Sequence, residues 1–87
     1  MNYIAKVLAL LEKNIPNPTE LLDLYALLVL VKGAETTLKD VHDAWAIWKN
    51  RINPIHKSLI EFDGLTVEVQ ELDRKYMEAI HQAAQEA

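Results

Sequence analysis

Apolar residues recur at steps of three and four along most of the chain, a spacing that places them on one face of an amphipathic helix. The first such run covers residues 2–13, and the following Asn14-Ile15-Pro16 contains a proline that stops a helix. We therefore predict a first helix that ends near residue 13. Its buried face should carry Ile4, Val7, Leu8 and Leu11.

The next segment has a helix start signal followed by an apolar run without a polar face. Asn17 is placed to cap a second helix over residues 18–32, with Pro18 at its first position and Glu20 three residues after the cap. Gly33 is placed to end this helix in a left-handed conformation. We expect the other helices to wrap it, with a second copy or another protein on one face as the alternative. Its apolar residues are Leu21, Leu22, Leu24, Tyr25, Leu27, Leu28, Val29, Leu30 and Val31.

A third helix is predicted to run to about residue 51. The pair Thr36-Thr37 offers a threonine cap, with Asp40 in the following turn. His42 and Lys49 are expected along the edge of the core-facing stripe of this helix. The stripe itself consists of Leu38, Val41, Trp45, Trp48 and Ile52.

The rest of the chain contains one segment without helical periodicity and one further helix. Pro54 breaks the third helix, and we expect an irregular connection over residues 55–65, with short strand pairing as the alternative. Thr66 is placed to cap the last helix. These elements predict an all-α, compact four-helix domain with an irregular segment between helices 3 and 4. The buried face of the last helix should carry Val69, Leu72, Tyr76, Ala79, Ile80 and Ala83.

Length and composition narrow the class of protein. A chain of 87 residues has room for one hydrophobic core, so we treat residues 1–87 as a single domain in which residues 1–35 form an N-terminal helical pair. The formal net charge of -4 has the wrong sign for general nucleic-acid binding. The absence of cysteine leaves no disulfide framework and suits a reducing cytoplasm.

Neither a membrane span nor a secretory leader is expected. The most apolar stretch, residues 21–31, contains Asp23 and is far shorter than the roughly 20 apolar residues that cross a bilayer. The first residues lack the basic segment, apolar stretch and small-residue cleavage site of a signal peptide. The expected location is therefore the cytoplasm.

The polar residues give no catalytic or metal-binding signature. Ser58 is the only serine, and nothing around it or the nearby His56 forms a nucleophile elbow. The three histidines, including His42 and His81, do not have the spacing of a compact zinc site. We expect a protein that is not an enzyme and that binds no metal ion and no cofactor.

The two tryptophans of the third helix have two interpretations. Trp45 and Trp48 share the apolar stripe, which favours packing into the core. Alternatively, they stack on a flat ligand whose phosphate Lys49 and Arg51 would hold. Packing is the simpler interpretation, because the helical step alone accounts for it.

Residues 41–80 carry a series of short motifs in a definite order. The third helix contains His42, Trp45 and Ala46 as a His-x-x-Trp-Ala motif. The following segment and the last helix supply His56, Leu59, Phe62, Leu65, Glu68 and Asp73. In this order the motifs resemble those of a ryanodine-receptor (RyR) repeat, so residues 36–87 are identified as the RyR-repeat-like part of the chain.

The resemblance has two departures and implies a biological setting. A RyR repeat has a Gly-Trp-x-Tyr-Gly loop after its first helix, whereas this chain goes almost directly to Pro54, and His56-Lys57 replaces the usual His-Pro step. Such repeats are non-enzymatic in ryanodine receptors, and the bacterial and phage relatives imply sensing of nucleotide-derived ligands. The short form is similar to small proteins of actinobacteria and their phages, which implies a phage or prophage origin.

Two functions are expected from these patterns. The first is a non-enzymatic protein-interaction module of phage or prophage origin, which binds a bacterial host protein in the host cytoplasm or a second copy of itself. The second is a sensor or sponge for a nucleotide-derived small molecule, bound in a groove between the third helix and residues 55–65. The candidate ligand-binding residues are His42, Trp45, Lys49, His56 and Asp73.

Overall fold

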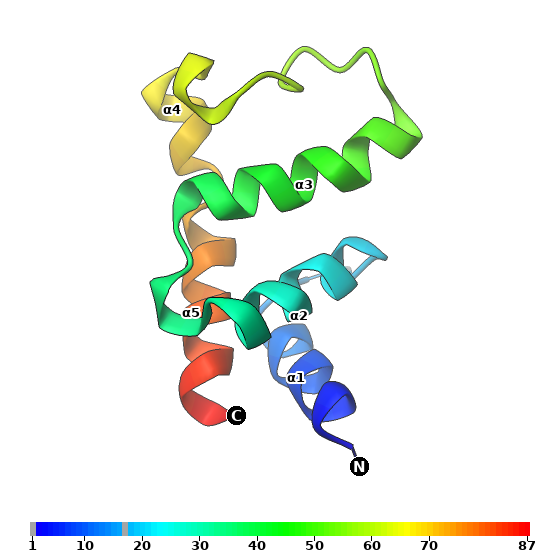
Figure 1. Cartoon of the computed structure of the whole chain (residues 1–87), viewed down its shortest axis with the longest axis vertical. Coiled ribbons are helices and arrows are strands. Elements are labelled where there is room, and N and C mark those ends of the chain that lie inside the picture. Colours follow the sequence, from blue (N-terminus) through cyan, green and yellow to red (C-terminus); the bar gives the residue numbers. More distant parts are fainter. Residues whose placement is uncertain (1, 17) are drawn as a thin grey trace.

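The chain forms α-helices, and the longest connection between them covers residues 53–66 (Figure 1). The computed structural model describes residues 2–16 and 18–87. Within these residues there is no strand, so the predicted all-α class is confirmed and the strand-pairing alternative is wrong. The elements are α1 (Tyr3–Glu12), α2 (Leu21–Val31), the 3-10 turn η1 (Gly33–Glu35), α3 (Leu38–Ile52), the 3-10 turn η2 (Phe62–Gly64), α4 (Val67–Glu71) and α5 (Arg74–Glu86).

Four main helices, α1, α2, α3 and α5, form the compact domain, and α4 is a single short turn of helix. Helix α2 contacts each of the other three main helices. Residues 53–61 return along α3 to reach η2 and α4 beyond the first turn of α3 (Figure 1). This return brings the predicted irregular segment, which contains no α-helix, back over α3.

Three helices begin at side chains that accept hydrogen bonds from their first turn. Thr37 and Asp40 form a reciprocal capping box at the start of α3, with Thr37 N–H donating to Asp40 Oδ2 at 2.9 Å. Thr66 accepts from the backbone of α4, so both predicted threonine caps are confirmed. Asn2 caps α1 by accepting from the backbone N–H of Ala5 at 2.8 Å.

Helix α2 begins at Leu21, three residues later than the predicted start at Pro18. The Thr19 hydroxyl accepts from the backbone N–H of Leu21, and the Thr19 carbonyl accepts from that of Leu22. These bonds form a turn that competes with a helical start at Pro18. The predicted Asn17 cap lies outside the described residues, whereas Gly33 takes the predicted left-handed conformation, with φ of 56°.

The last helix is divided, although the sequence pattern predicts one continuous helix. It ends as α4 at Glu71 and resumes as α5 at Arg74, and Leu72 between them is 68% exposed instead of buried. The helix divides because α4 is held against η2. The Gln70 side chain donates hydrogen bonds to the carbonyls of Phe62 and Leu65. Helix α5 instead packs on α1 and α2, so the two parts follow different neighbours.

The core lies where α1, α2 and α5 meet, with the first half of α3 against them. Tyr25 of α2 stacks on Tyr76 of α5 with ring centroids 5.7 Å apart. Ile80 at the middle of α5 is completely buried. The remaining buried apolar residues are Val7, Leu11, Ile15, Leu22, Ala26, Val29, Val41, Ala44, Ala79 and Ala83.

Helix α2 is wrapped on one face only. Leu22, Tyr25, Ala26 and Val29 are buried, as expected for a central helix. The opposite face is open to solvent, because Leu27, Leu30 and Val31 are exposed. This exposed apolar face is what the alternative expectation requires, in which a second copy or another protein covers one face of the helix.

Helix α3 departs from its predicted stripe at both ends. His42 was expected at the edge of the stripe but is only 3% exposed, because it contacts the Ile60 carbonyl and the Phe62 ring. Ile52 was expected in the stripe but is exposed at the last residue of α3, where the chain turns away. Val41, the residue before His42, is fully buried, as predicted.

The core assignment predicts a difference between two equivalent substitutions. Replacing Ile80 by valine removes one methylene group from a fully buried site, and the free energy of unfolding should fall by about 1 kcal/mol. Ile55, which is 89% exposed, provides the matched control, and Ile55→Val should change stability by less than about 0.5 kcal/mol. Urea unfolding followed by circular dichroism measures both, and equal effects would contradict the assignment.

Candidate functional site

A cavity of about 440 Å³ lies beside α3 and is shared by several elements. This volume falls in the range of about 300–1,000 Å³ that is typical of small-molecule sites. Pro16, Thr19 and Leu72 in its wall are exposed, so the cavity opens to solvent. The lining residues are Ile15, Pro16, Thr19, Leu21, Leu22, Tyr25, His42, Trp45, Trp48, His56, Ser58, Val69, Leu72, Asp73 and Tyr76.

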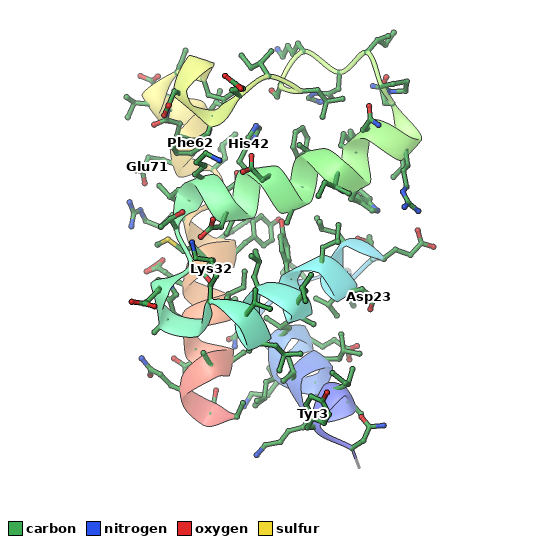
Figure 2. All side chains as sticks on the ribbon, in the orientation of Figure 1. Tyr3, Asp23, Lys32, His42, Phe62 and Glu71 are labelled. Carbon is green, nitrogen blue, oxygen red and sulfur yellow. The ribbon has the colours of Figure 1, made fainter. Side chains whose placement is uncertain are left out.

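Two histidines flank Trp45 in the cavity wall. The His42 ring stacks on Trp45 with centroids 5.7 Å apart, one turn of α3 away. The His56 ring meets the same indole edge-on at 5.2 Å, from the segment that follows α3. The centroids of the His42 and Phe62 rings are 6.2 Å apart. Phe62 is the first residue of η2, and Figure 2 shows it close to His42.

Hydrogen bonds set the tautomer of each neutral histidine. His42 Nε2 lies 2.7 Å from the Ile60 carbonyl and must donate to it, which leaves His42 Nδ1 as an acceptor. The backbone N–H of Ser58 donates to His56 Nδ1 at 3.0 Å, so His56 Nε2 carries the proton. One ring can therefore accept a hydrogen bond and the other can donate one.

Two further polar groups in the cavity wall have no partner among the described residues. The Tyr25 hydroxyl and the Trp48 Nε1–H are both buried and make no hydrogen bond. Leaving a buried donor unsatisfied costs about 1–3 kcal/mol. Both residues line the cavity, so a bound molecule is a candidate partner for these two donors.

Among the described residues that line the cavity, Asp73 is the only one with a carboxylate, and none is a lysine or an arginine. It is the N-cap residue of α5, yet its side chain makes no capping hydrogen bond, unlike an ordinary N-cap aspartate. Burial raises the pKa of the Asp73 carboxyl, and the neighbouring His42 partly opposes this. Burial, with the nearby Asp73 and Tyr76, also raises the pKa of Tyr25.

Four of the five residues expected to bind a ligand line this cavity together: His42, Trp45, His56 and Asp73. Lys49 does not line it. The Lys49 ammonium instead lies 5.4 Å from the centroid of the Trp48 ring. The interpretation in which Lys49 holds a phosphate in the site therefore has no support from the geometry.

The N-terminal half contributes more to the cavity than the sequence patterns indicated. The expected groove lay between the third helix and residues 55–65, but α2 and the turn before it form much of the wall. Tyr25 lines the cavity, although the sequence pattern assigned it only to the core. The sequence feature that could have indicated this role is a hydroxyl group in an otherwise aliphatic helix, since a buried tyrosine normally needs a partner for its O–H.

The described residues do not assemble a nucleophile with a base. His56 Nδ1 is engaged by the backbone of Ser58, and no hydrogen bond joins the Ser58 hydroxyl to a histidine within the described part of the chain. Residues 2–16 and 18–87 contain no group of three or more side chains suited to hold a metal ion. The absence of enzymatic activity stays a prediction.

Fold and site together define a small all-α domain with an open, aromatic-walled cavity. The chain belongs to a family described as a domain of unknown function (DUF7701), whose model matches residues 2–85. No curated protein and no solved structure matches the chain. No helix in the described residues is long and apolar enough to span a bilayer. The RyR-repeat resemblance stays a prediction.

The charge of Asp73 predicts a characteristic pH dependence of stability. Because its pKa is raised in the folded state, Asp73 opposes folding at neutral pH, and this penalty disappears as pH falls through the raised pKa. Asp73→Asn should therefore raise the free energy of unfolding at pH 7, with the gain vanishing below the ordinary aspartate pKa of 3.8. Urea unfolding across this pH range measures the difference.

Glu71 provides a control of opposite sign for this prediction. Its hydrogen bond from Arg74 lowers the pKa of the Glu71 carboxyl, so Glu71 stabilises the fold at neutral pH and loses this contribution in acid. Glu71→Gln should therefore lower stability slightly at pH 7. If the Asp73→Asn protein is less stable than the wild type at pH 7, burial does not make the charged Asp73 carboxylate unfavourable for folding, and the prediction is wrong.

Proposed function

We propose that the chain is a non-enzymatic binding module that takes a small organic molecule into the cavity beside α3. The observation that carries this proposal is a pair of buried, unpartnered donors, Tyr25 O–H and Trp48 Nε1–H, which belong to two residues that line the cavity. Small-molecule sites combine a mostly apolar wall with a few such polar groups. A sensor or a sponge is the role that fits a binding site without catalytic machinery.

The energetics support a functional origin for these unpartnered groups. A domain of this size has a total stability on the order of 5–15 kcal/mol, so two unsatisfied donors are a large fraction of it. Replacing Tyr25 by phenylalanine and Trp48 by an aliphatic residue would remove that cost. A ligand that accepts hydrogen bonds from both donors would offset that cost.

The resemblance to a RyR repeat supports the same site. Of the residues that match its motifs, His42, Trp45, His56 and Asp73 line the proposed cavity. Helix α2 supplies another part of the wall, so the expected ligand contacts also include Tyr25, which is not one of the matching residues.

Tyr25→Phe tests the proposal with the smallest change in shape. Loss of the hydroxyl should leave stability unchanged or raise it by up to about 1 kcal/mol, because an unsatisfied buried group is removed. Affinity for benzamide and nicotinamide, two small aromatic hydrogen-bond acceptors, should fall about threefold to tenfold. Isothermal titration and urea unfolding measure the two quantities.

Tyr3→Phe is the matched control, because Tyr3 is 70% exposed and does not line the cavity. It should change neither affinity nor stability. If the Tyr25→Phe protein is destabilised and binds both compounds as well as the wild type does, the Tyr25 hydroxyl has a structural partner and the proposal loses its main support.

Protein binding is the second candidate, and the exposed face of α2 favours it. Leu27, Leu30 and Val31 lie at helical spacing on this face, which no other element covers. The partner would be a second copy of the chain or, for a protein of phage or prophage origin, a component of the bacterial host. A patch of this kind is typical of an interaction surface.

Sedimentation velocity tests self-association through α2. If the α2 face joins two copies, Leu30→Lys should weaken the dimer by about tenfold or more, since a charge replaces a buried interface leucine. Ile47→Lys, at an exposed position on α3, is the control and should leave association unchanged. A wild-type protein that stays monomeric at millimolar concentration would exclude self-association as the role of this face.

A further inference from the structure

The charge of the cavity wall restricts the class of ligand. Among the described residues that line the cavity, Asp73 is the only carboxylate and none is a lysine or arginine. Lys49 lies over the Trp48 ring and outside the lining. A phosphate or carboxylate in this cavity would meet the like charge of Asp73, with only the imidazoles of His42 and His56 to oppose it.

We propose that the cavity is selective for small aromatic cations, with the cationic group paired to Asp73 and the ring packed among the aromatic side chains of the wall. This inference rests on the proposed ligand site and adds the charge of the ligand to it. It reverses the expectation of a phosphate-bearing ligand held by Lys49.

Asp73 is available for such a pairing. Its side chain does not cap α5, and no hydrogen bond or ion pair joins it to another described residue. Its partial burial removes water from the carboxylate and raises its pKa, so a charged partner gains more from it than from a surface carboxylate. A cation in the cavity would restore the favourable surroundings that burial removes.

The aromatic residues of the wall favour the same sign of charge. Trp45, Trp48, Tyr25 and Tyr76 all line the cavity, and the electron-rich faces of such rings attract cations. Two of these rings already attract cations of the chain itself: Lys49 lies over Trp48, and Lys75 lies 5.0 Å from the Tyr76 centroid. Aromatic rings beside one carboxylate form a type of site suited to organic cations.

The net charge of the whole chain acts in the same direction. At -4 it attracts cations and repels anions over longer distances than the contacts in the cavity. This effect weakens with salt, whereas pairing with a partly buried carboxylate is screened much less. Selectivity that persists at high ionic strength would therefore belong to the cavity.

Three compounds of nearly the same shape separate charge from shape: benzamidinium, benzamide and benzoate. Their binding to the full chain at pH 7 and high salt is followed by isothermal titration, with NMR titration for weak binding. Benzamidinium should bind about tenfold more tightly than benzamide, and benzoate more weakly than either. Asp73→Asn should remove the preference for benzamidinium while leaving the affinity for benzamide unchanged.

Each outcome separates the inference from the proposed function. If benzamide or benzoate binds as well as benzamidinium, the cavity is a ligand site but is not selective for cations, and only this inference fails. If none of the three binds, the cavity is not a ligand site and the proposed function fails with it. Because the wild-type comparison decides the question, the result holds even if the Asp73→Asn protein does not fold.

Discussion

The burial of one face of α2 is the contact on which the rest of the structure depends. Apart from Asp23, this helix is apolar around its axis, and α1, α3 and α5 all pack against it. Tyr25 lies at the centre of this packing and stacks on Tyr76, which fixes α5 relative to α2. Because α3 crosses the same helix, the space beside Tyr25 and Trp48 becomes the cavity.

The same packing explains how the cavity combines apolar and polar character. The aliphatic residues of α2 and the preceding turn supply the apolar wall. Helix α3 brings two tryptophans and His42 to it, the segment after α3 brings His56, and Asp73 comes from the start of α5. Residues far apart in the sequence, such as Tyr25 of α2, Trp48 of α3 and Asp73 before α5, meet in this wall. A site of this kind uses the stability of the core to hold groups that are individually unfavourable for folding.

Local signals were enough to predict most of the helices. The threonine caps of α3 and α4 and the left-handed Gly33 involve residues within one turn of each other, so they could be read from the sequence. The break at Leu72 could not, because it depends on the Gln70 side chain reaching the carbonyls of η2. The late start of α2 follows from Thr19, whose hydrogen bonds compete with the more obvious proline signal.

The candidate site was predicted in part. The sequence motifs contain His42, Trp45, His56 and Asp73, which were chosen as aromatic, hydrogen-bonding or charged residues. These four line one cavity. Lys49 was included because its charge suits a phosphate, but the direction of its side chain depends on packing against Trp48. The role of Tyr25 depends on its being 1% exposed and without a partner, and neither property is visible before the helices are placed.

The most direct test of the cavity as a ligand site is a ¹H–¹⁵N NMR spectrum of the labelled protein, recorded with and without a set of small aromatic fragments. The chain has two tryptophans, so only two indole N–H signals occur, and that of Trp48 reports on an unpartnered donor in the cavity wall. The account predicts that binding fragments shift the Trp48 indole signal and the amides of residues around Tyr25 and Asp73. Fragments that bind only to the exposed face of α2, or a Trp48 signal that no fragment shifts, would contradict it.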